Sequence, residues 1–180
     1  MTFHDVLGLW FSPVARPNWF ERSDAFDAEV RRHLAAPHER AAAGELADWS
    51  EHPKACLALV ILLDQVPRNI FRGTLRAFST DVAACKLSYL AFERGYDAGF
   101  DRDEKLFLYL PLQHSENLAD QRLSVEVSRQ RIGDPECIDY AERHLRIVER
   151  FGRFPHRNRA LGRPSTPEEI EFLKEPGSSF

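Results

Sequence analysis

The chain has 180 residues and a formal net charge of −4, which excludes a general electrostatic attraction to nucleic acid or to anionic membranes. Its apolar fraction of 43% and its thirteen phenylalanines against nine glycines exclude a disordered chain. A chain of this length can bury a sizeable core, so we expect a single domain over residues 1–180.

Neither a leader nor a membrane span is expected. The amino terminus, MTFHDVLGLWFSP, has no basic segment before its apolar residues. The longest apolar run, Ala55–Leu63, is far shorter than the roughly 20 residues that cross a bilayer. Three scattered cysteines, Cys56, Cys85 and Cys137, suit a reducing compartment. We therefore expect a cytoplasmic protein without a membrane partner.

Apolar residues recur at helical spacing along the chain, whereas strand patterns are almost absent. We predict an all-α fold of antiparallel helix pairs joined by short turns. The first clear helix is capped by Ser23 and places Phe26, Val30 and Leu34 on one face. Pro37 should end or kink this helix.

The next helix should begin at Pro53 and form the centre of the core. Its run Ala55–Leu63 is apolar on every side, which is typical of a helix enclosed by its neighbours. Pro67 should push Val66 out of the α region, so that Arg68 leaves the helix axis.

Two helices are predicted after this core helix. Ser79 should cap one that ends at Gly95. Its inward residues should be Ala83, Leu87, Leu90 and Ala91. The other should run from about Asp103 to Pro111, which we expect to break it.

The last two predicted helices have clear boundary signals. Asp134 followed by Pro135 opens a helix that ends at Gly152. Its inward residues should be Ile138, Ala141, Leu145 and Val148. In STPEEIEFL, Thr166 caps the final helix and Glu169 completes a capping box.

Two segments end an apolar run with proline and place arginine and asparagine close behind it: DQVPRNIFRG at 64–73 and FGRFPHRN at 151–158. Asp64 lies near a helix carboxyl end, where the dipole disfavours negative charge, so it needs a cation. Arg68 and Arg72 are the nearest candidates. An Asp64–Arg68 pair that only stabilises the turn is an equal alternative to a ligand-binding pair, because planar Arg–carboxylate pairs serve both purposes.

The second of these segments is rich in arginine. Between Arg150 and Arg163 there are five arginines and no acid, a density that creates a local positive potential. Pro155 prevents the preceding helix from resuming and leaves His156, Arg157 and Asn158 in a turn. Turns of this kind often carry binding residues.

A third candidate segment is LPLQHSEN at 110–117. Ser115 should cap the next helix and place Glu116 in its first turn, where free N–H groups suit a carboxylate or a bound anion. His114, Glu116 and His156 are the candidates for acid–base catalysis, although a His–Glu pair is more often structural. The same three residues with Asp64 could ligate a metal. Since no two of them share a helix face at ligand spacing, we expect neither a metal nor a cofactor.

Other chemistries have weaker signals. Ser115 has no glycine-flanked elbow, the cysteines lie in apolar patterns, and no Gly-rich phosphate loop is present. The aromatic residues Trp10, Phe11, Trp19 and Phe20 should pack helix ends, and the alternative of an aromatic wall in a ligand cleft is less favoured.

Three stretches resemble an uncharacterised, mainly bacterial family, domain of unknown function 924. They are LLDQVPRNIFRG at 62–73, LPLQHSE at 110–116 and FGRFPHRNRALGRPSTPEE at 151–169, and the resemblance covers nearly the whole chain. It implies an α-α superhelix similar to tetratricopeptide-repeat proteins. It implies no activity, cofactor or catalytic residue.

We predict that the three segments converge on one cleft at the same edge of the helical stack. Arginine side chains would bind the ligand, asparagine amides would orient it, and Asp64 and Glu116 would hold the arginines. The ligand-binding candidates are Asp64, Arg68, Asn69, Arg72, Arg153, Arg157, Asn158 and Arg163. The catalytic candidates remain His114, Glu116 and His156.

The leading functional hypothesis is a pocket for a small anionic molecule, a carboxylate or a phosphate, and it leaves open whether a reaction follows binding. The alternative is a tetratricopeptide-like module that holds an acidic peptide or protein partner in an open groove. Nucleic-acid binding, with Phe151 and Phe154 as stacking rings, is the least favoured of the three because the chain is acidic. The oligomeric state is left open.

Overall fold

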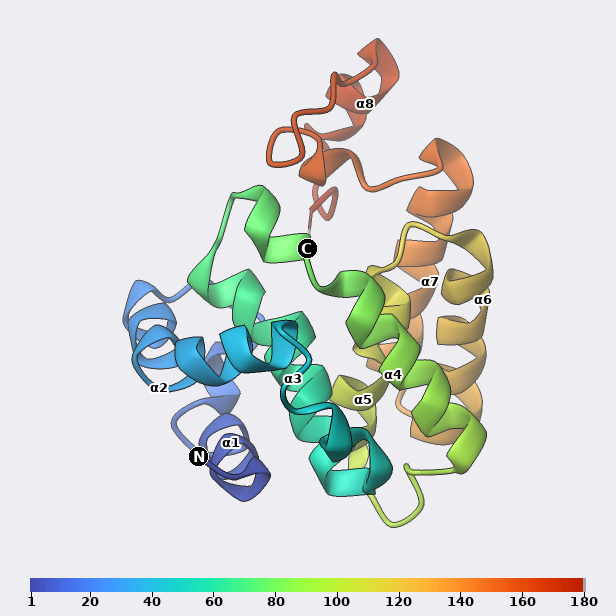
Figure 1. Ribbon diagram of the computed structural model, residues 1–180. Coiled ribbons are helices and arrows are strands. Elements are labelled where there is room, and N and C mark those ends of the chain that lie inside the picture. Colours follow the sequence, from blue (N-terminus) through green and yellow to red (C-terminus); the bar gives the residue numbers. More distant parts are fainter. Residues whose placement is uncertain (180) are drawn as a thin grey trace.

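The computed structural model describes residues 1–179 (Figure 1). Its α-helices are α1 (Phe3–Trp10), α2 (Asp24–Ala42), α3 (Pro53–Ile70), α4 (Asp81–Arg94), α5 (Arg102–His114), α6 (Leu118–Val127), α7 (Pro135–Phe151) and α8 (Pro167–Phe172). Short 3₁₀ turns lie at Arg16–Asn18, Ala47–Glu51, Leu75–Phe78 and Pro155–Arg157, and a π-helical turn lies at Ser128–Ile132. Strands are absent from these 179 residues, so the predicted all-α fold is confirmed.

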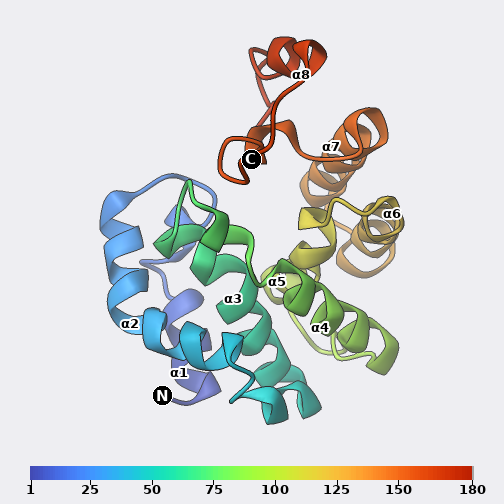
Figure 2. The same ribbon diagram turned by 45° about the horizontal axis from the view of Figure 1, so that its top comes forward.

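The helices pack in chain order. From α2 to α7 each helix contacts the next, and α3 also contacts α5, as α5 contacts α7. This connectivity is that of stacked antiparallel helix pairs. Both ribbon views show α1 to α3 on one side, α4 to α7 on the other, and α8 standing apart from the stack (Figures 1 and 2). No helix within residues 1–179 has the length and apolarity needed to cross a membrane.

Helix α3 forms the centre of the core, as predicted. Every residue of Ala55–Leu63 is buried, and so are the residues from Asp64 to Pro67 that follow. The aromatic residues of the amino-terminal segment pack against α5: the Trp10 and Trp19 rings lie 5.5 and 4.7 Å from the Phe107 ring, centroid to centroid. The helix-packing interpretation of these residues is therefore confirmed.

Three prolines lie inside helices. Pro37 does not end α2 and Pro111 does not break α5, so these two predicted helix ends are wrong. Pro67 is also internal. In α2 the buried residues Leu34 and His38 stay on one face on either side of the proline. Their packing outweighs the roughly 3 kcal/mol that an interior proline costs.

The proline of α3 leaves a backbone acceptor to be satisfied. Because Pro67 has no N–H, the carbonyl of Leu63, four residues earlier, lacks its helical partner. The hydroxyl of Thr80, just before α4, donates a hydrogen bond to that carbonyl. Helix α3 therefore continues to Ile70, and the expectation that Arg68 leaves the helix axis is wrong.

Two helices begin later than predicted. Thr80 rather than Ser79 is the N-cap residue of α4, and Asn117 rather than Ser115 caps α6. The Asn117 side chain accepts a hydrogen bond from the backbone N–H two residues on, at 2.8 Å, whereas the Ser115 hydroxyl donates to a carboxylate of α6. Glu116 consequently precedes α6 instead of lying in its first turn.

The inward faces of α4 and α7 differ from the predicted ones. Helix α4 buries Ala84, Ser88 and Ala91, and α7 buries Cys137, Ala141, His144, Ile147 and Val148. Ala83, predicted to face inward, is exposed. A purely apolar pattern misses these faces because each includes a polar residue: Ser88 donates to the Leu108 carbonyl at 2.7 Å, and His144 lies within α7.

Other boundary predictions are confirmed. Gly95 and Gly152 end α4 and α7 with φ of 64° and 68°, in the left-handed region that glycine adopts most readily. The capping box of Thr166 and Glu169 opens α8.

We predict that Thr80→Val lowers the free energy of unfolding by about 1–2 kcal/mol, because the Leu63 carbonyl loses its donor. Thr80→Ser should lose less. In a Pro67→Ala background the restored N–H can bond the same carbonyl, so Thr80→Val should then have a clearly smaller effect. Urea unfolding of the four variants of this cycle measures the coupling, and equal effects in both backgrounds would contradict the assignment.

Candidate anion-binding site

The three motif segments meet through a chain of side-chain contacts. His114, at the end of α5, places Nδ1 2.8 Å from Oδ1 of Asp64 in α3. Arg68, one turn further along α3, places Nη1 3.2 Å from the same oxygen. Arg157, in the 3₁₀ turn after α7, joins through Asp81 at the start of α4. The three segments therefore converge as expected. The segment at 64–73 contributes Asp64 and Arg68, the segment at 110–117 contributes His114, and the segment at 151–158 contributes Arg157.

Asp64 is the buried anion of this network. Its side chain is fully buried and also accepts a hydrogen bond from Gln65 Nε2 at 2.6 Å. Burial alone would raise the pKa of Asp64, but the Arg68 guanidinium, and after it His114, outweigh burial and hold that pKa below its usual value. Asp64 is thus a carboxylate at neutral pH.

His114 is held in one orientation by Asp64. Since the carboxylate only accepts, Nδ1 carries a proton and donates it, which leaves the lone pair on Nε2. The ring is 15% exposed. Burial and then Arg68 lower the pKa of His114, with Asp64 opposing them in part, so the ring is neutral at pH 7. A neutral imidazole oriented by a carboxylate can act as a general base.

Asp81 connects the two arginines, and no sequence pattern singles it out. Both of its oxygens accept from Arg68, at 2.8 and 3.0 Å, and Oδ2 lies 3.3 Å from Arg157 Nη1. Acidic residues are common in the first turn of a helix, where they interact favourably with the helix dipole. The position of Asp81 in the sequence is therefore ordinary, and its role as a bridge between two arginines cannot be recognised there.

Arg157 is a buried arginine with unused donors. It is 6% exposed, and its guanidinium carbon lies 4.8 Å from the centroid of the Phe78 ring and 4.7 Å from that of the Phe154 ring. Its hydrogen bond to Asp81 is long, and Nε has no partner among the described residues. Burial and then Arg68 lower the pKa of Arg157 to about 10, so it keeps its charge. Guanidinium donors that are open in this way can form charge-assisted hydrogen bonds with an anion.

Two further histidines lie close to this network. The ring of His144 is 6.5 Å from that of His114 and 5.6 Å from Phe154, and His156 is 5.6 Å from Phe154, centroid to centroid. Burial lowers the pKa of His144 to about 3 and that of His156 to about 4, so both are neutral. Sequence analysis missed His144 because it occupies an apolar position of α7.

Two further arginines of the carboxyl-terminal segment, Arg153 and Arg163, are paired with carboxylates. Arg163 makes two hydrogen bonds to Glu116, at 2.7 and 2.9 Å, and Glu116 also accepts from the Phe154 N–H at 2.8 Å. Arg153 likewise makes two bonds to Glu169, at 2.7 and 2.9 Å. The predicted ligand-binding residue Asn158 donates to the same Glu169 at 3.2 Å. These contacts hold the carboxyl-terminal segment in place: some lie within the segment, and others join it to the turn between α5 and α6.

The other two ligand-binding candidates lie elsewhere. Asn69 and Arg72 both bind Asp27 of α2, at distances of 2.7 to 2.8 Å. The two proline segments are therefore not equivalent turns: Arg68 and Asn69 are consecutive residues of a continuous helix, so their side chains point about 100° apart around its axis.

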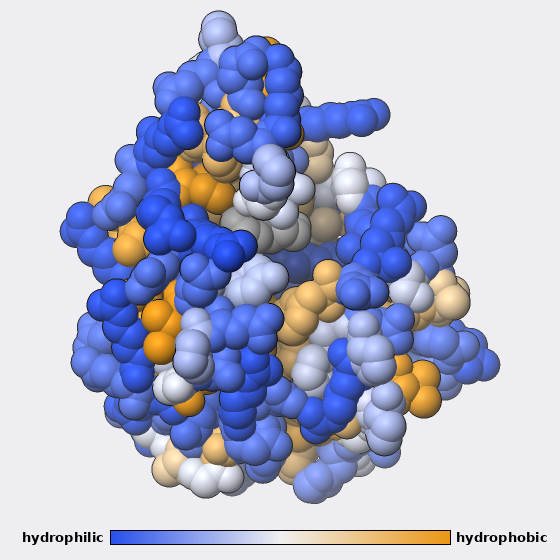
Figure 3. Space-filling model, turned by 180° about the vertical axis from the view of Figure 1, so that it is seen from behind, coloured by the Kyte–Doolittle hydropathy of each residue, from blue (hydrophilic) through white to orange (hydrophobic). Residues whose placement is uncertain are grey.

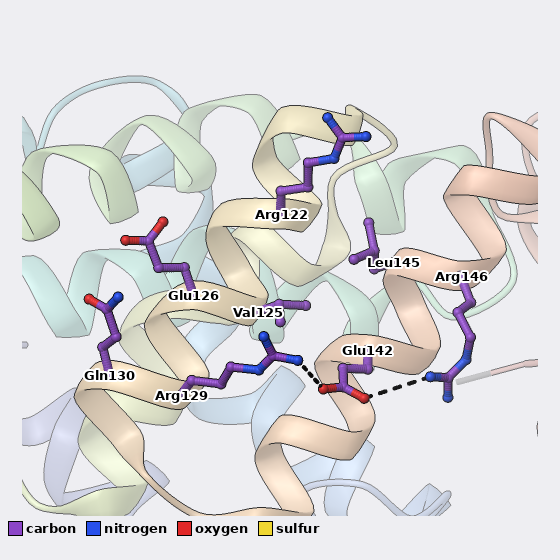
Figure 4. Close-up of a pocket in the computed structure, with 8 residues that line it drawn as sticks. All are labelled: Arg122, Val125, Glu126, Arg129, Gln130, Glu142, Leu145 and Arg146. Atoms are coloured by element: carbon purple, nitrogen blue, oxygen red, sulfur yellow. Dashed lines mark hydrogen bonds and ion pairs between the residues drawn. The ribbon is translucent and has the colours of Figure 1, made fainter.

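Two hollows of the described surface lie away from the central network, and neither is lined by His114 or Arg157. The larger, 570 Å³, lies between α6 and α7 and is drawn in Figure 4. Its rim holds Arg129 and Arg146 on either side of Glu142, 2.6 and 3.7 Å away. The smaller, 460 Å³, contains Asn69 and Arg72. The face opposite that of Figure 1 is also hollowed near its middle, beneath α8 (Figure 3).

Metal and thiol chemistry find no support in the described part of the chain. Within residues 1–179 no group of His, Cys, Asp and Glu side chains is placed to hold a metal ion. Burial raises the pKa of Cys56 and Cys85 to about 12, so neither is an activated thiolate.

The fold and the network define an all-helical protein with a buried carboxylate–histidine–arginine cluster, a class whose fold alone does not specify an activity. A family model described as bacterial protein of unknown function (DUF924) matches residues 6–177, and the chain belongs to this family. A solved structure of a protein of unknown function from Agrobacterium tumefaciens is 38% identical, with a TM-score of 0.91 over 97% of each chain. The comparison with curated proteins found no match.

We predict that stability falls between pH 6 and pH 5. The unfolded chain protonates His144 near pH 6.5 but the folded chain does so only near pH 3, so falling pH favours unfolding by up to about 1.4 kcal/mol per pH unit. His144→Gln should reduce this slope. Urea unfolding at both pH values tests this, and an unaltered slope in His144→Gln would contradict the assignment.

Proposed function

We propose that this protein binds a small anionic ligand through Arg157 and that His114, oriented by Asp64, exchanges a proton with it. The observation that carries the proposal is the state of Arg157: it is almost fully buried, charged, and uses few of its five N–H donors. Arginines with a structural role are usually saturated, as Arg163 is by Glu116.

The surroundings of Arg157 support a ligand that is partly enclosed. The rings of Phe78 and Phe154 both contact the guanidinium, which restricts its movement before an anion arrives. Asp81 links it to Arg68, and Arg68 contacts the Asp64–His114 pair. The anion-binding group and the proton-transfer group thus belong to one rigid network.

Two of the predicted site residues, Glu116 and Arg68, receive a different role in this proposal. Glu116 is engaged by Arg163 and by the Phe154 N–H, so we assign it to holding the carboxyl-terminal segment. Arg68 holds Asp64 and Asp81 rather than the ligand.

The acidic-peptide alternative requires a row of available cations along a groove. Most arginines of the family motifs instead pair with carboxylates of the same chain, as Arg72 does with Asp27 and Arg153 with Glu169. This pairing favours a single small anion over an extended acidic partner.

We predict that a bound anion raises the melting temperature. At a ligand concentration of 100 times Kd the gain is about 2.7 kcal/mol, or about 5–10 °C for a chain of this size. The probes are acetate, benzoate, inorganic phosphate and phenyl phosphate at constant ionic strength. Arg157→Gln should abolish the shift, while Arg150→Gln, which removes an exposed partner of Glu168, should retain it.

Two results would count against this assignment: no shift with any of the four anions, or an equal shift in Arg157→Gln with unchanged circular dichroism. His114→Asn should preserve binding, because the histidine is assigned to proton transfer. In isothermal titrations repeated in buffers of different ionisation enthalpy, proton uptake on binding should be lower in His114→Asn than in the wild type.

A further inference from the structure

The charges around Arg157 are almost balanced before any ligand binds. In the central network, the positive charges of Arg68 and Arg157 face the negative charges of Asp64 and Asp81. The adjacent pairs are balanced as well, with Arg163 on Glu116 and Arg153 on Glu169. The site therefore offers one guanidinium with open donors and no surplus of positive charge.

The neighbouring groups do not add positive charge. Burial keeps the pKa values of His144 and His156 at about 3 and 4, and that of His114 below its ordinary value, so the three rings are neutral. The amino terminus of α4, which could attract an anion, already holds the carboxylate of Asp81 in its first turn.

We propose that the ligand of this site is a monocarboxylate and not a phosphate, an inference that rests on the anion site proposed above. A carboxylate has one charge and two coplanar oxygens, which match the planar fork of a single guanidinium. A phosphate monoester carries a charge of about −1.5 to −2 at pH 7 and three oxygens, so it needs further cations or donors. Here the second charge would be buried without a partner.

Asp81 determines this preference. It accepts two hydrogen bonds from Arg68 and one long hydrogen bond from Arg157, and it is the anion nearest to the open donors. A second, more highly charged anion at Arg157 would be repelled by it. Removing its charge should therefore favour phosphate over carboxylate.

The test compares two ligands of similar shape, benzoate and phenyl phosphate, by isothermal titration at pH 7.5 and constant ionic strength. We expect benzoate to bind at least about tenfold more tightly, which corresponds to a difference of about 1.4 kcal/mol in binding free energy. Asp81→Asn should reduce the benzoate-to-phosphate ratio by about tenfold. Asp27→Asn, which removes the carboxylate shared by Asn69 and Arg72, is the matched control and should leave the ratio unchanged.

The outcomes separate the two proposals. If phenyl phosphate binds as tightly as benzoate, and Arg157→Gln abolishes both, the anion site stands and the carboxylate class is wrong. If neither compound binds the folded wild type, both proposals fail. If Asp81→Asn is unfolded by circular dichroism, Asp81→Ser replaces it, and an unchanged ratio in a folded variant overturns the role given to Asp81.

Discussion

A fully buried carboxylate, Asp64, is the constraint on which the arrangement of the site depends. It lies at the end of the most apolar stretch of the molecule, where an unpaired charge would be very unfavourable. Arg68 and His114 compensate it, and this requirement fixes where α5 ends relative to α3. Breaking such a pair leaves an uncompensated buried charge, so the contact specifies position more than it adds stability.

The compensation extends outward in steps. Arg68 needs a second carboxylate, which α4 supplies as Asp81, and Asp81 in turn contacts Arg157 from the segment after α7. Each step brings in a part of the chain that is more distant in sequence. A single buried charge thus organises α3, α4, α5 and the carboxyl-terminal segment around one point, and the central site is formed where these parts meet.

The sequence predicts the features that depend on local chemistry. The buried course of α3, the glycine ends at Gly95 and Gly152, and the capping box at Thr166 follow from residue types and their spacing. The prediction for Pro67 failed because a helix enclosed by neighbours can tolerate a missing N–H when another group, here Thr80, satisfies the free carbonyl. That donor is distant in sequence, so no local pattern shows it.

The candidate site was predicted only in part for the same reason. Asp64, His114 and Arg157 belong to segments with unusual composition, whereas Asp81 and His144 are ordinary in their local sequence and acquire a role through packing. Asn69 and Arg72 share the proline segment with Arg68 but not its direction. Asn69 lies within α3 and Arg72 just beyond its end, and both bind Asp27 of α2.

Arg157 is synthesised after almost all residues of the main hydrophobic core. The main apolar cluster is complete with residues of α1 to α7, and a separate small cluster of Ile147, Val148, Phe154 and Phe172 supports the last part of the chain. During synthesis the helical body can therefore assemble around Asp64, His114 and Asp81 before Arg157 leaves the ribosome. A shortened translation product would carry a nearly complete hydrophobic core and would lack the cation opposite Asp81. The main hydrophobic core and the cation opposite Asp81 thus come from different parts of the chain.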